Sequence, residues 1–361
     1  MEQLRREFPV FERKAYLNAG SNGPVPARAA EAANAAIARQ SAEGRSGKQM
    51  VEELMAQLGD LRTRIAGLFH CDPAEVALTG STTDRVNAVL AALDLRAGDE
   101  IVTSDEEHPG LLAPLAAARE RHGVRIRVAP LRELASAVGE RTRLVACSHV
   151  SWQTGDVVDC GALAAAGAPV LLDGAQGLGA VPVDVRLLGC DFYAASGQKW
   201  LCGPNGSGYL YVRAERAAEL APPWPGYSTL SEAANPLESG FHEDARRFDI
   251  LGFPAEHQLA WALAALDVLE EAGLDRVHDH AGAQAEALAQ RLIESGREVA
   301  PRGHSTLVSW QAEDPGALVA ELGERGFVLR DLPGTPYVRA SVGAWNDQSD
   351  IDGLLGALSG S

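Results

Sequence analysis

The sequence lacks the features that mark several classes of protein. No window approaches eighteen consecutive apolar residues, so we expect no membrane-spanning segment. Lys and Arg number 32 against 49 Asp and Glu and form no concentrated stripe, which argues against a nucleic-acid partner. The net charge of −17 is instead a property that favours solubility. The opening segment MEQLRREFPVFERKAYL is charged and lacks the apolar core of a signal peptide, so we expect a cytoplasmic protein.

Cysteine is also scarce. The five cysteines are Cys71, Cys147, Cys160, Cys190 and Cys202. Because the count is odd and no CxxC pair occurs, the sequence predicts neither a disulfide framework nor a zinc site, and we expect no metal. Cys202 follows Lys199 by three residues. A free cysteine is more often a small packed residue than a nucleophile, and that interpretation is preferred here.

Apolar residues are abundant, at 46% of the chain, and their pattern predicts an α/β fold. Short apolar runs alternate with helical patterns in the first half, which is typical of βαβ units. The run VLLDG is apolar without a break, as expected of a strand covered on both faces. We expect strands at 75–80, 99–104, 124–130, 143–150, 168–174, 190–195 and 206–213, with helices between them such as 84–93 and 110–123.

The pattern changes after Arg213. Residues 221–240 are rich in Pro, Gly and Ser and predict a long loop. Two helices at 254–273 and about 275–295 precede a tail of alternating strands and helices, which indicates a small α+β unit. We expect three parts: a helix within 1–15 that packs near the small domain, a large domain at 16–245 and a small domain at 246–361.

Lys199 is the one lysine in the apolar, glycine-rich stretch DFYAASGQKWLCGPNGSGYLYV. A charged amine is costly to bury unless it is paired or neutralised. Candidate partners lie at other predicted strand ends. They are Asp173 after VLLD, His108 in SDEEHPG, and the hydroxyl groups of Ser81, Thr82 and Thr83 where a helix starts. Taken singly, each has an ordinary explanation as a helix cap, a turn residue or a surface histidine.

Taken together, these residues suggest pyridoxal phosphate. The lysine would hold the cofactor covalently, and desolvation lowers the pKa of such a lysine towards the useful neutral amine. The carboxylate of Asp173 would keep the ring nitrogen protonated, so that the ring acts as an electron sink. The helix N-terminus would hold the phosphate. The flat side chain of His108 would lie on the ring face.

The ordered motifs GSTTD, EEHPG, SHVSWQTG, DGAQG, SGQKWLCGPNGSG and VRAS resemble the class V aminotransferase superfamily. This group contains cysteine desulfurases, cysteine and cystine C–S lyases and isopenicillin N epimerases. The resemblance runs from residue 16 to residue 355. It implies fold type I, with a mostly parallel seven-stranded sheet in a large domain and a small α+β C-terminal domain. It also implies a homodimer whose active sites are built from both subunits.

The resemblance implies roles for individual residues. Lys199, Asp173 and His108 look like the covalent, ring-nitrogen and stacking residues, and Gln176 like the partner of the ring hydroxyl oxygen. The remaining cofactor contacts implied are Ser81, Thr82, Thr83, Trp152, Ser196, Gln198 and the backbone of Gly252. The substrate contacts implied are Asn18, Ala19, Gly20, Arg330 and, as the clamp on the α-carboxylate, Arg339.

The chain departs from the desulfurases in its side chains. The stretch FVLRDLPGTPYVRAS lacks the nucleophilic cysteine, Gln198 replaces a usual histidine, Trp152 stands where an asparagine is common, and 248–254 contains no threonine. Trp152 and the short stretch without cysteine look more similar to the C–S lyases, and this resemblance implies β-elimination from cysteine, cystine or a related sulfur amino acid or sulfoxide conjugate, giving pyruvate, ammonia and a sulfur product. Transamination, epimerisation and desulfuration on the same cofactor remain open, as does, remotely, a non-catalytic cofactor-binding protein.

Overall fold

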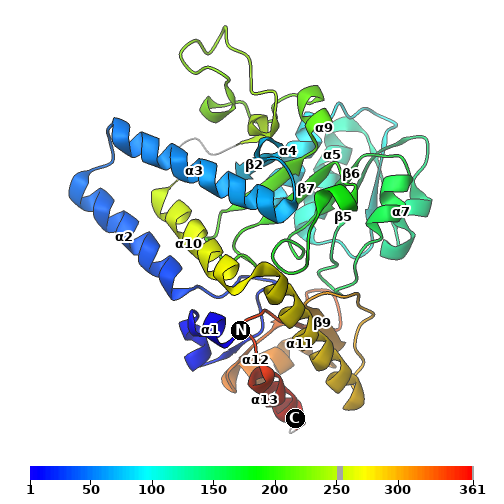
Figure 1. Cartoon of the computed structure of the whole chain (residues 1–361). Coiled ribbons are helices and arrows are strands. Elements are labelled where there is room, and N and C mark those ends of the chain that lie inside the picture. Colours follow the sequence, from blue (N-terminus) through cyan, green and yellow to red (C-terminus); the bar gives the residue numbers. More distant parts are fainter. Residues whose placement is uncertain (250–254, 360–361) are drawn as a thin grey trace.

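The computed structural model describes residues 1–249 and 255–359 and has an α/β body joined to a smaller part that contains both chain ends (Figure 1). Within those residues, no helix combines the length and the apolarity needed to cross a membrane. The predicted loop at 221–240 is confirmed, since it contains only a single turn of 3-10 helix at Tyr227–Thr229.

A seven-stranded sheet forms the centre of the body, in the order β2-β8-β7-β6-β5-β3-β4. Its strands are β2 (Val76–Thr79), β3 (Glu100–Ser104), β4 (Arg125–Ala129), β5 (Thr142–Ser148), β6 (Val170–Asp173), β7 (Phe192–Ser196) and β8 (Gly208–Val212). The pairs β2–β8 and β7–β8 are antiparallel and the other described pairs are parallel, so the sheet is mostly parallel. All seven strands were predicted, with ends that differ by two residues at most.

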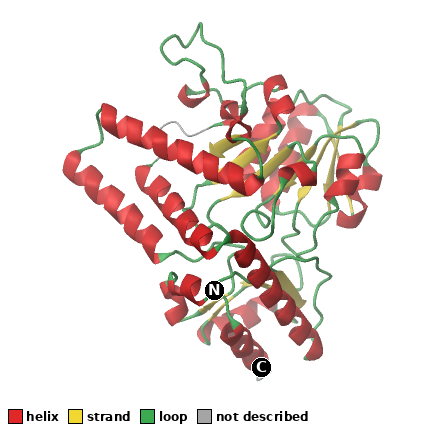
Figure 2. Ribbon diagram, viewed as in Figure 1, coloured by secondary structure: helices red, strands yellow, loops and turns green. Residues whose placement is uncertain are grey.

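Both faces of the sheet are covered, which explains the unbroken apolar runs. Successive side chains of a strand point to opposite faces. On β5, Cys147 therefore joins one core with α3 (Lys48–Phe69) and α10 (Glu256–Ala272), whereas Ala146 joins another with α4 (Thr82–Ala92) and α5 (Pro109–His122). Figure 2 shows helices on both sides of the strands. The remaining helices of the body are α2 (Ala27–Glu43), which packs along α10, α6 (Leu134–Ala137), α7 (Cys160–Ala165), α8 (Val185–Leu188) and α9 (Ala214–Glu219).

The smaller part is built on an antiparallel sheet of order β11-β12-β9. Its elements are β9 (Leu307–Gln311), β10 (Phe327–Val328), β11 (Arg330–Asp331), β12 (Tyr337–Ser341), α11 (Leu274–Glu294), α12 (Pro315–Glu324) and α13 (Gln348–Leu358). The N-terminal segment adds α1 (Glu2–Arg6) and β1 (Ala15–Tyr16), which pairs with β10. Arg5 binds Asp350 at 2.7 Å, which joins α1 to α13. The division of the chain at residues 15 and 245 stays a prediction.

Candidate active site

A cavity of about 360 Å³ lies at the carboxyl ends of the central strands. Ser148, Asp173 and Ser196 are the last residues of β5, β6 and β7, and the β5–β6 register pairs Ser148 with Asp173. Ligands of open α/β sheets bind at this edge. The cavity brings together most of the predicted site residues: Gly20, Ser81, Thr82, Thr83, His108, Trp152, Asp173, Gln176, Ser196, Gln198, Lys199, Arg330 and Arg339.

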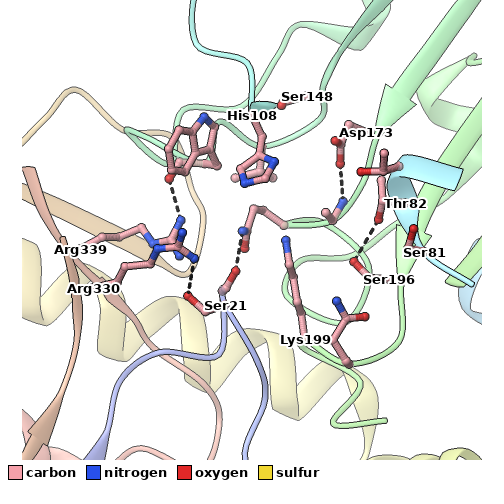
Figure 3. Close-up of a pocket in the computed structure, with 17 residues that line it drawn as sticks. Ser21, Ser81, Thr82, His108, Ser148, Asp173, Ser196, Lys199, Arg330 and Arg339 are labelled. Atoms are coloured by element: carbon pink, nitrogen blue, oxygen red, sulfur yellow. Dashed lines mark hydrogen bonds between the residues drawn. The ribbon is translucent and has the colours of Figure 1, made fainter. Parts of the chain in front are cut away.

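Lys199 and Asp173 both line this cavity, and burial shifts the pKa of each towards the neutral form (Figure 3). Burial lowers the pKa of Lys199 to about 8, and the two nearby arginines add to that shift while Asp173 opposes it. Burial raises the pKa of Asp173, against the effect of Lys199 and of the Ala175 amide, which donates to Asp173 Oδ1 at 2.9 Å. The Lys199 amine therefore populates both its charged and its neutral form at neutral to mildly alkaline pH.

The loop that carries Lys199 is fixed from two sides. Gly23 donates its amide to Gln198 O at 2.8 Å, and a Cβ on Gly23 would lie 2.0 Å from Lys199 O. On the other side, Trp261 of α10 donates to Cys202 O at 2.9 Å. Cys202 itself has a φ of 55°, a left-handed conformation that is unfavourable for a side chain with a Cβ. The lysine thus projects from a tight turn rather than from a mobile loop.

The start of α4 offers a place for an anion. Ser81 caps the helix and accepts the Asp84 amide at 3.1 Å, while Thr82 Oγ1 and Ser196 Oγ lie 3.0 Å apart. Helix N-terminal amides and hydroxyl groups favour phosphate. Across from them, Gln198 has a buried Oε1 without a hydrogen-bond partner. A rotated amide would place its NH₂ group there instead, since the two ends of this side chain differ only in donor and acceptor character.

Two aromatic rings meet above the cavity at a right angle. The ring centroids of His108 and Trp152 lie 5.0 Å apart with an interplanar angle of 86°. His108 caps α5 by accepting the Gly110 amide on Nδ1 at 2.9 Å, so the proton of the neutral ring is on Nε2. Burial and the charges of Lys199 and the two arginines lower the pKa of His108 to about 4, so this ring is neutral at physiological pH.

The opposite wall carries two arginines. Arg339 is 1% exposed and donates Nη1 to Trp152 O at 2.7 Å, but its Nε and Nη2 groups have no partner. Arg330 donates to Ser21 Oγ at 3.0 Å. Gly20 makes room for them, because a Cβ there would lie 2.9 Å from Arg339 Nη2. Unpaired buried donors of this kind are a ready binding site for a carboxylate.

Both ends of the Gln176 amide are hydrogen-bonded to other residues of the protein. Its Nε2 donates to Gly20 O at 2.8 Å and its Oε1 accepts from Trp200 Nε1 at 3.0 Å. One N–H of the amide remains free for a ligand.

Two of the predicted residues that the structure describes do not line the cavity. Ala19 is fully buried, and Asn18 acts behind the wall, where its Oδ1 accepts from Ser21 Oγ at 2.8 Å. Gly252 lies outside the described residues. The cavity also includes Ser21, Ser148, Val150 and Ala175, which sequence reasoning missed. Ser148 lies two residues before the end of the strand predicted at 143–150, and that position alone did not mark it as a site residue.

No cysteine lines the cavity, although the structure describes all five. Burial raises the pKa of Cys202 well above its usual value, and its Sγ makes a long hydrogen bond to Trp200 O, at 3.9 Å. Since the thiolate is the reactive form, Cys202 is placed as an inert packed residue. Among the described residues, no cluster of His, Cys, Asp and Glu could hold a metal ion.

Comparison with known proteins gives a consistent result. The family described as aminotransferase class-V matches residues 15–354. A probable cysteine desulfurase of Pseudomonas aeruginosa is 32% identical over 395 aligned positions, covering 98% of this chain and 96% of its own. An isopenicillin N epimerase of Streptomyces clavuligerus is 36% identical over 236 positions, covering 61% of this chain and 59% of its own.

Solved structures agree. A complex of the cystine C–S lyase C-DES with its reaction product cysteine persulfide has a TM-score of 0.92 at 30% identity, with 98% of this chain and 99% of that chain covered. A C-DES mutant with glycine covalently linked to its PLP cofactor has a TM-score of 0.93 at 30% identity, with 98% of both chains covered.

Proposed function

The chain belongs to the class-V aminotransferase family, and from that premise we propose that it is a pyridoxal-phosphate-dependent C–S lyase. Its substrate would be cysteine, cystine or a related sulfur amino acid or sulfoxide conjugate, and its products pyruvate, ammonia and a sulfur compound. The observation that carries this choice is the absence of a reactive thiol: none of the five described cysteines lines the cavity. The sulfur would therefore leave in a small molecule, as sulfide, persulfide or thiol, rather than be transferred to a cysteine of the protein.

The residues of the cavity fit this cofactor. Lys199 is a buried amine with a lowered pKa, Asp173 is a buried carboxylate at the adjacent strand end, and α4 begins with free amides and hydroxyl groups. We assign the phosphate to Ser81, Thr82, Thr83, Ser196 and Gln198, the ring nitrogen to Asp173, and the ring face to His108. The bound cofactor would supply an electron sink for a carbanion next to the amino group.

The charges of the cavity fit an anionic substrate as well. Among the described residues that line the cavity, Asp173 is the one acidic side chain. Three lining side chains are basic, namely Lys199, Arg330 and Arg339. The phosphate of the cofactor would offset part of this excess, and the α-carboxylate of an amino acid would offset more. We assign that carboxylate to the unpaired Nε and Nη2 groups of Arg339, with Arg330 beside it.

The chemical step uses groups that this chain provides. Lys199 in its neutral form takes the α-proton of the substrate as general base. Arg339 holds the carboxylate and so fixes the orientation of the Cα–H bond. The bond between the β-carbon and sulfur then breaks, and the sulfur leaves with the electron pair. Lys199 can return its proton to the leaving group, and hydrolysis of the remaining three-carbon fragment gives pyruvate and ammonia.

We also propose that the protein acts as a homodimer. The segment at 221–241 exposes large apolar side chains, with Leu237 at 99%, Tyr227 at 70% and Trp224 at 48% exposure. Figure 1 shows this segment extending away from the body. A second copy would cover such side chains, and light scattering of the purified protein should give twice the mass of one chain.

The experiment that tests the activity is a screen of cysteine, cystine and S-substituted cysteine sulfoxides with the purified protein and added pyridoxal phosphate. Pyruvate formed in the absence of any keto-acid acceptor, together with released sulfide, persulfide or thiol, supports the lyase. A strict need for a keto acid would identify an aminotransferase, and sulfur retained on the protein would identify a desulfurase.

A further inference from the structure

Glu107 is a buried carboxylate that the proposed mechanism does not use. It is 3% exposed and lies directly before His108. Its two oxygens accept the Ser148 amide at 2.9 and 3.0 Å, the Ser148 hydroxyl at 2.6 Å and the hydroxyl of Ser104. Three donors therefore converge on one carboxylate, and two of them belong to Ser148. A buried group with this many partners fixes the position of its neighbours.

The contact with Ser148 decides what that residue shows to the cavity. A serine hydroxyl has a single proton, and Ser148 donates it to Glu107. The oxygen of Ser148, which lines the cavity, is left with lone pairs only. Ser148 is also the register partner of Asp173 on the neighbouring strand, and Figure 3 shows Ser148, His108 and Asp173 along the same side of the cavity. This side of the cavity thus combines a carboxylate with an oxygen that can only accept.

We infer that Glu107 is a positioning residue: by accepting the hydrogen bond of the Ser148 hydroxyl, it turns the ends of β5 and β6 into an acceptor-only wall that keeps the ring nitrogen of the cofactor protonated. The inference rests on the proposed cofactor site, but it does not depend on which bond of the substrate is cleaved. The same carboxylate joins the segment of His108 to the end of β5, so the ring-stacking residue and the wall are held by one group.

The charges around Glu107 agree with this arrangement. Burial raises the pKa of Glu107 to about 7, the hydrogen bonds from Ser104 and Ser148 oppose that rise, and the charge of Asp173 adds to it. The thiol of Cys147 on β5 also faces Glu107. Burial raises the pKa of this thiol, and the charge of Glu107 adds to that rise. Above pH 7 the ionised Glu107 adds negative charge behind Asp173, which also favours a protonated nitrogen.

The test is a pH titration of the absorbance of bound pyridoxal phosphate, without substrate, in the wild type and in Glu107→Gln. An amide is uncharged and has one acceptor oxygen, so Glu107→Gln removes the negative charge behind Asp173 and one of the two oxygens that accept from Ser148. We expect the midpoint of the titration to fall by about one pH unit, the order of shift that a neighbouring buried charge causes. We also expect a weaker equilibrium binding of pyridoxal phosphate to the apoprotein.

Ser148→Ala gives an independent measurement, because it removes the accepting oxygen and leaves Glu107 in place. We expect the same direction of shift, and a shift in the double variant that is smaller than the sum of the two single shifts, because the two residues share a hydrogen bond. Glu100→Gln, at the opposite end of β3, is the matched control and should leave the midpoint unchanged.

The outcomes separate the inference from the proposed function. A folded Glu107→Gln protein with the wild-type midpoint and affinity would overturn the inference. If Glu107→Gln does not fold, an unchanged midpoint in Ser148→Ala overturns it equally. A wild-type protein that takes up no pyridoxal phosphate would refute the proposed function, and the inference with it.

Discussion

Arg330 and Arg339 are directly opposite each other on the antiparallel strands β11 and β12, and both line the cavity. Like charges in opposed positions destabilise a strand pair. Burial, followed by the charge of Arg330, lowers the pKa of Arg339 to about 9. Such an arrangement favours a bound carboxylate, because the ligand removes the repulsion between the two side chains and satisfies their free donors.

Arg339→Lys should therefore raise the KM for an amino-acid substrate by about tenfold or more, since a single ammonium group cannot replace a bidentate fork. Steady-state kinetics of pyruvate formation measure the effect. Arg302→Lys is the control, because Arg302 is half-buried and pairs with Glu286 away from the cavity. An unchanged KM in Arg339→Lys would contradict the assignment.

The activity should depend on the protonation of Lys199. Burial lowers the pKa of its amine to about 8, and only the neutral amine can accept the α-proton. The rate should therefore be low below this pKa, rise as the pH passes through about 8, and level off above it. Lys199→Ala should lose both the yellow colour and turnover. Full turnover in Lys199→Ala, or a rate that falls from pH 7 to pH 9, would contradict the role of base.

Gly174 has no room for a side chain. A Cβ there would lie 1.8 Å from Cε1 of Tyr193, the buried residue that also bonds His149 at 2.9 Å. Gly174→Ala should lower the free energy of unfolding by about 3 kcal/mol, at the upper end of the effect of overpacking. Thermal unfolding measures this. Gly59→Ala in α3, where nothing lies within 4 Å of the added methyl, should instead stabilise by about 0.5–1 kcal/mol. An unchanged Tm in Gly174→Ala would contradict the packing described here.

The fold and the centre of the site could be predicted because their signals are local. Asp173 ends an apolar run, and Lys199 is the one lysine in its stretch, so both were identified from short segments. Ser148 was missed because its importance depends on the sheet order, which places β5 beside β6. Ser21 was missed because its partner, Arg330, is 309 positions away, and no local pattern reports a contact of that range.

Gln198 should add no pH dependence of its own to the binding of the phosphate. Its amide can donate a hydrogen bond but carries no charge, and its buried Oε1 has no partner. In Gln198→His, we expect the affinity of the apoprotein for pyridoxal phosphate to increase by about tenfold as the pH falls from 8 to 6, because the imidazole gains a proton and forms a charged hydrogen bond. Fluorescence titration at both pH values measures the change. The exposed Gln290→His is the control, and an equal pH dependence in both variants would contradict the prediction.

The role of Cys202 distinguishes the proposed lyase from a desulfurase. It is the cysteine next to the Lys199 turn, but it is 1% exposed, burial raises the pKa of its thiol well above the usual value, and it does not line the cavity. Cys202→Ala should therefore retain turnover and lose only about 1 kcal/mol of stability, the order expected for removing a small buried group. Intact-mass spectrometry of the wild type after turnover should show no added sulfur on the protein. Loss of turnover in a folded Cys202→Ala protein, or a persulfide on Cys202, would identify a desulfurase that uses this thiol, because a sulfur acceptor on the protein is the feature that separates the two reactions.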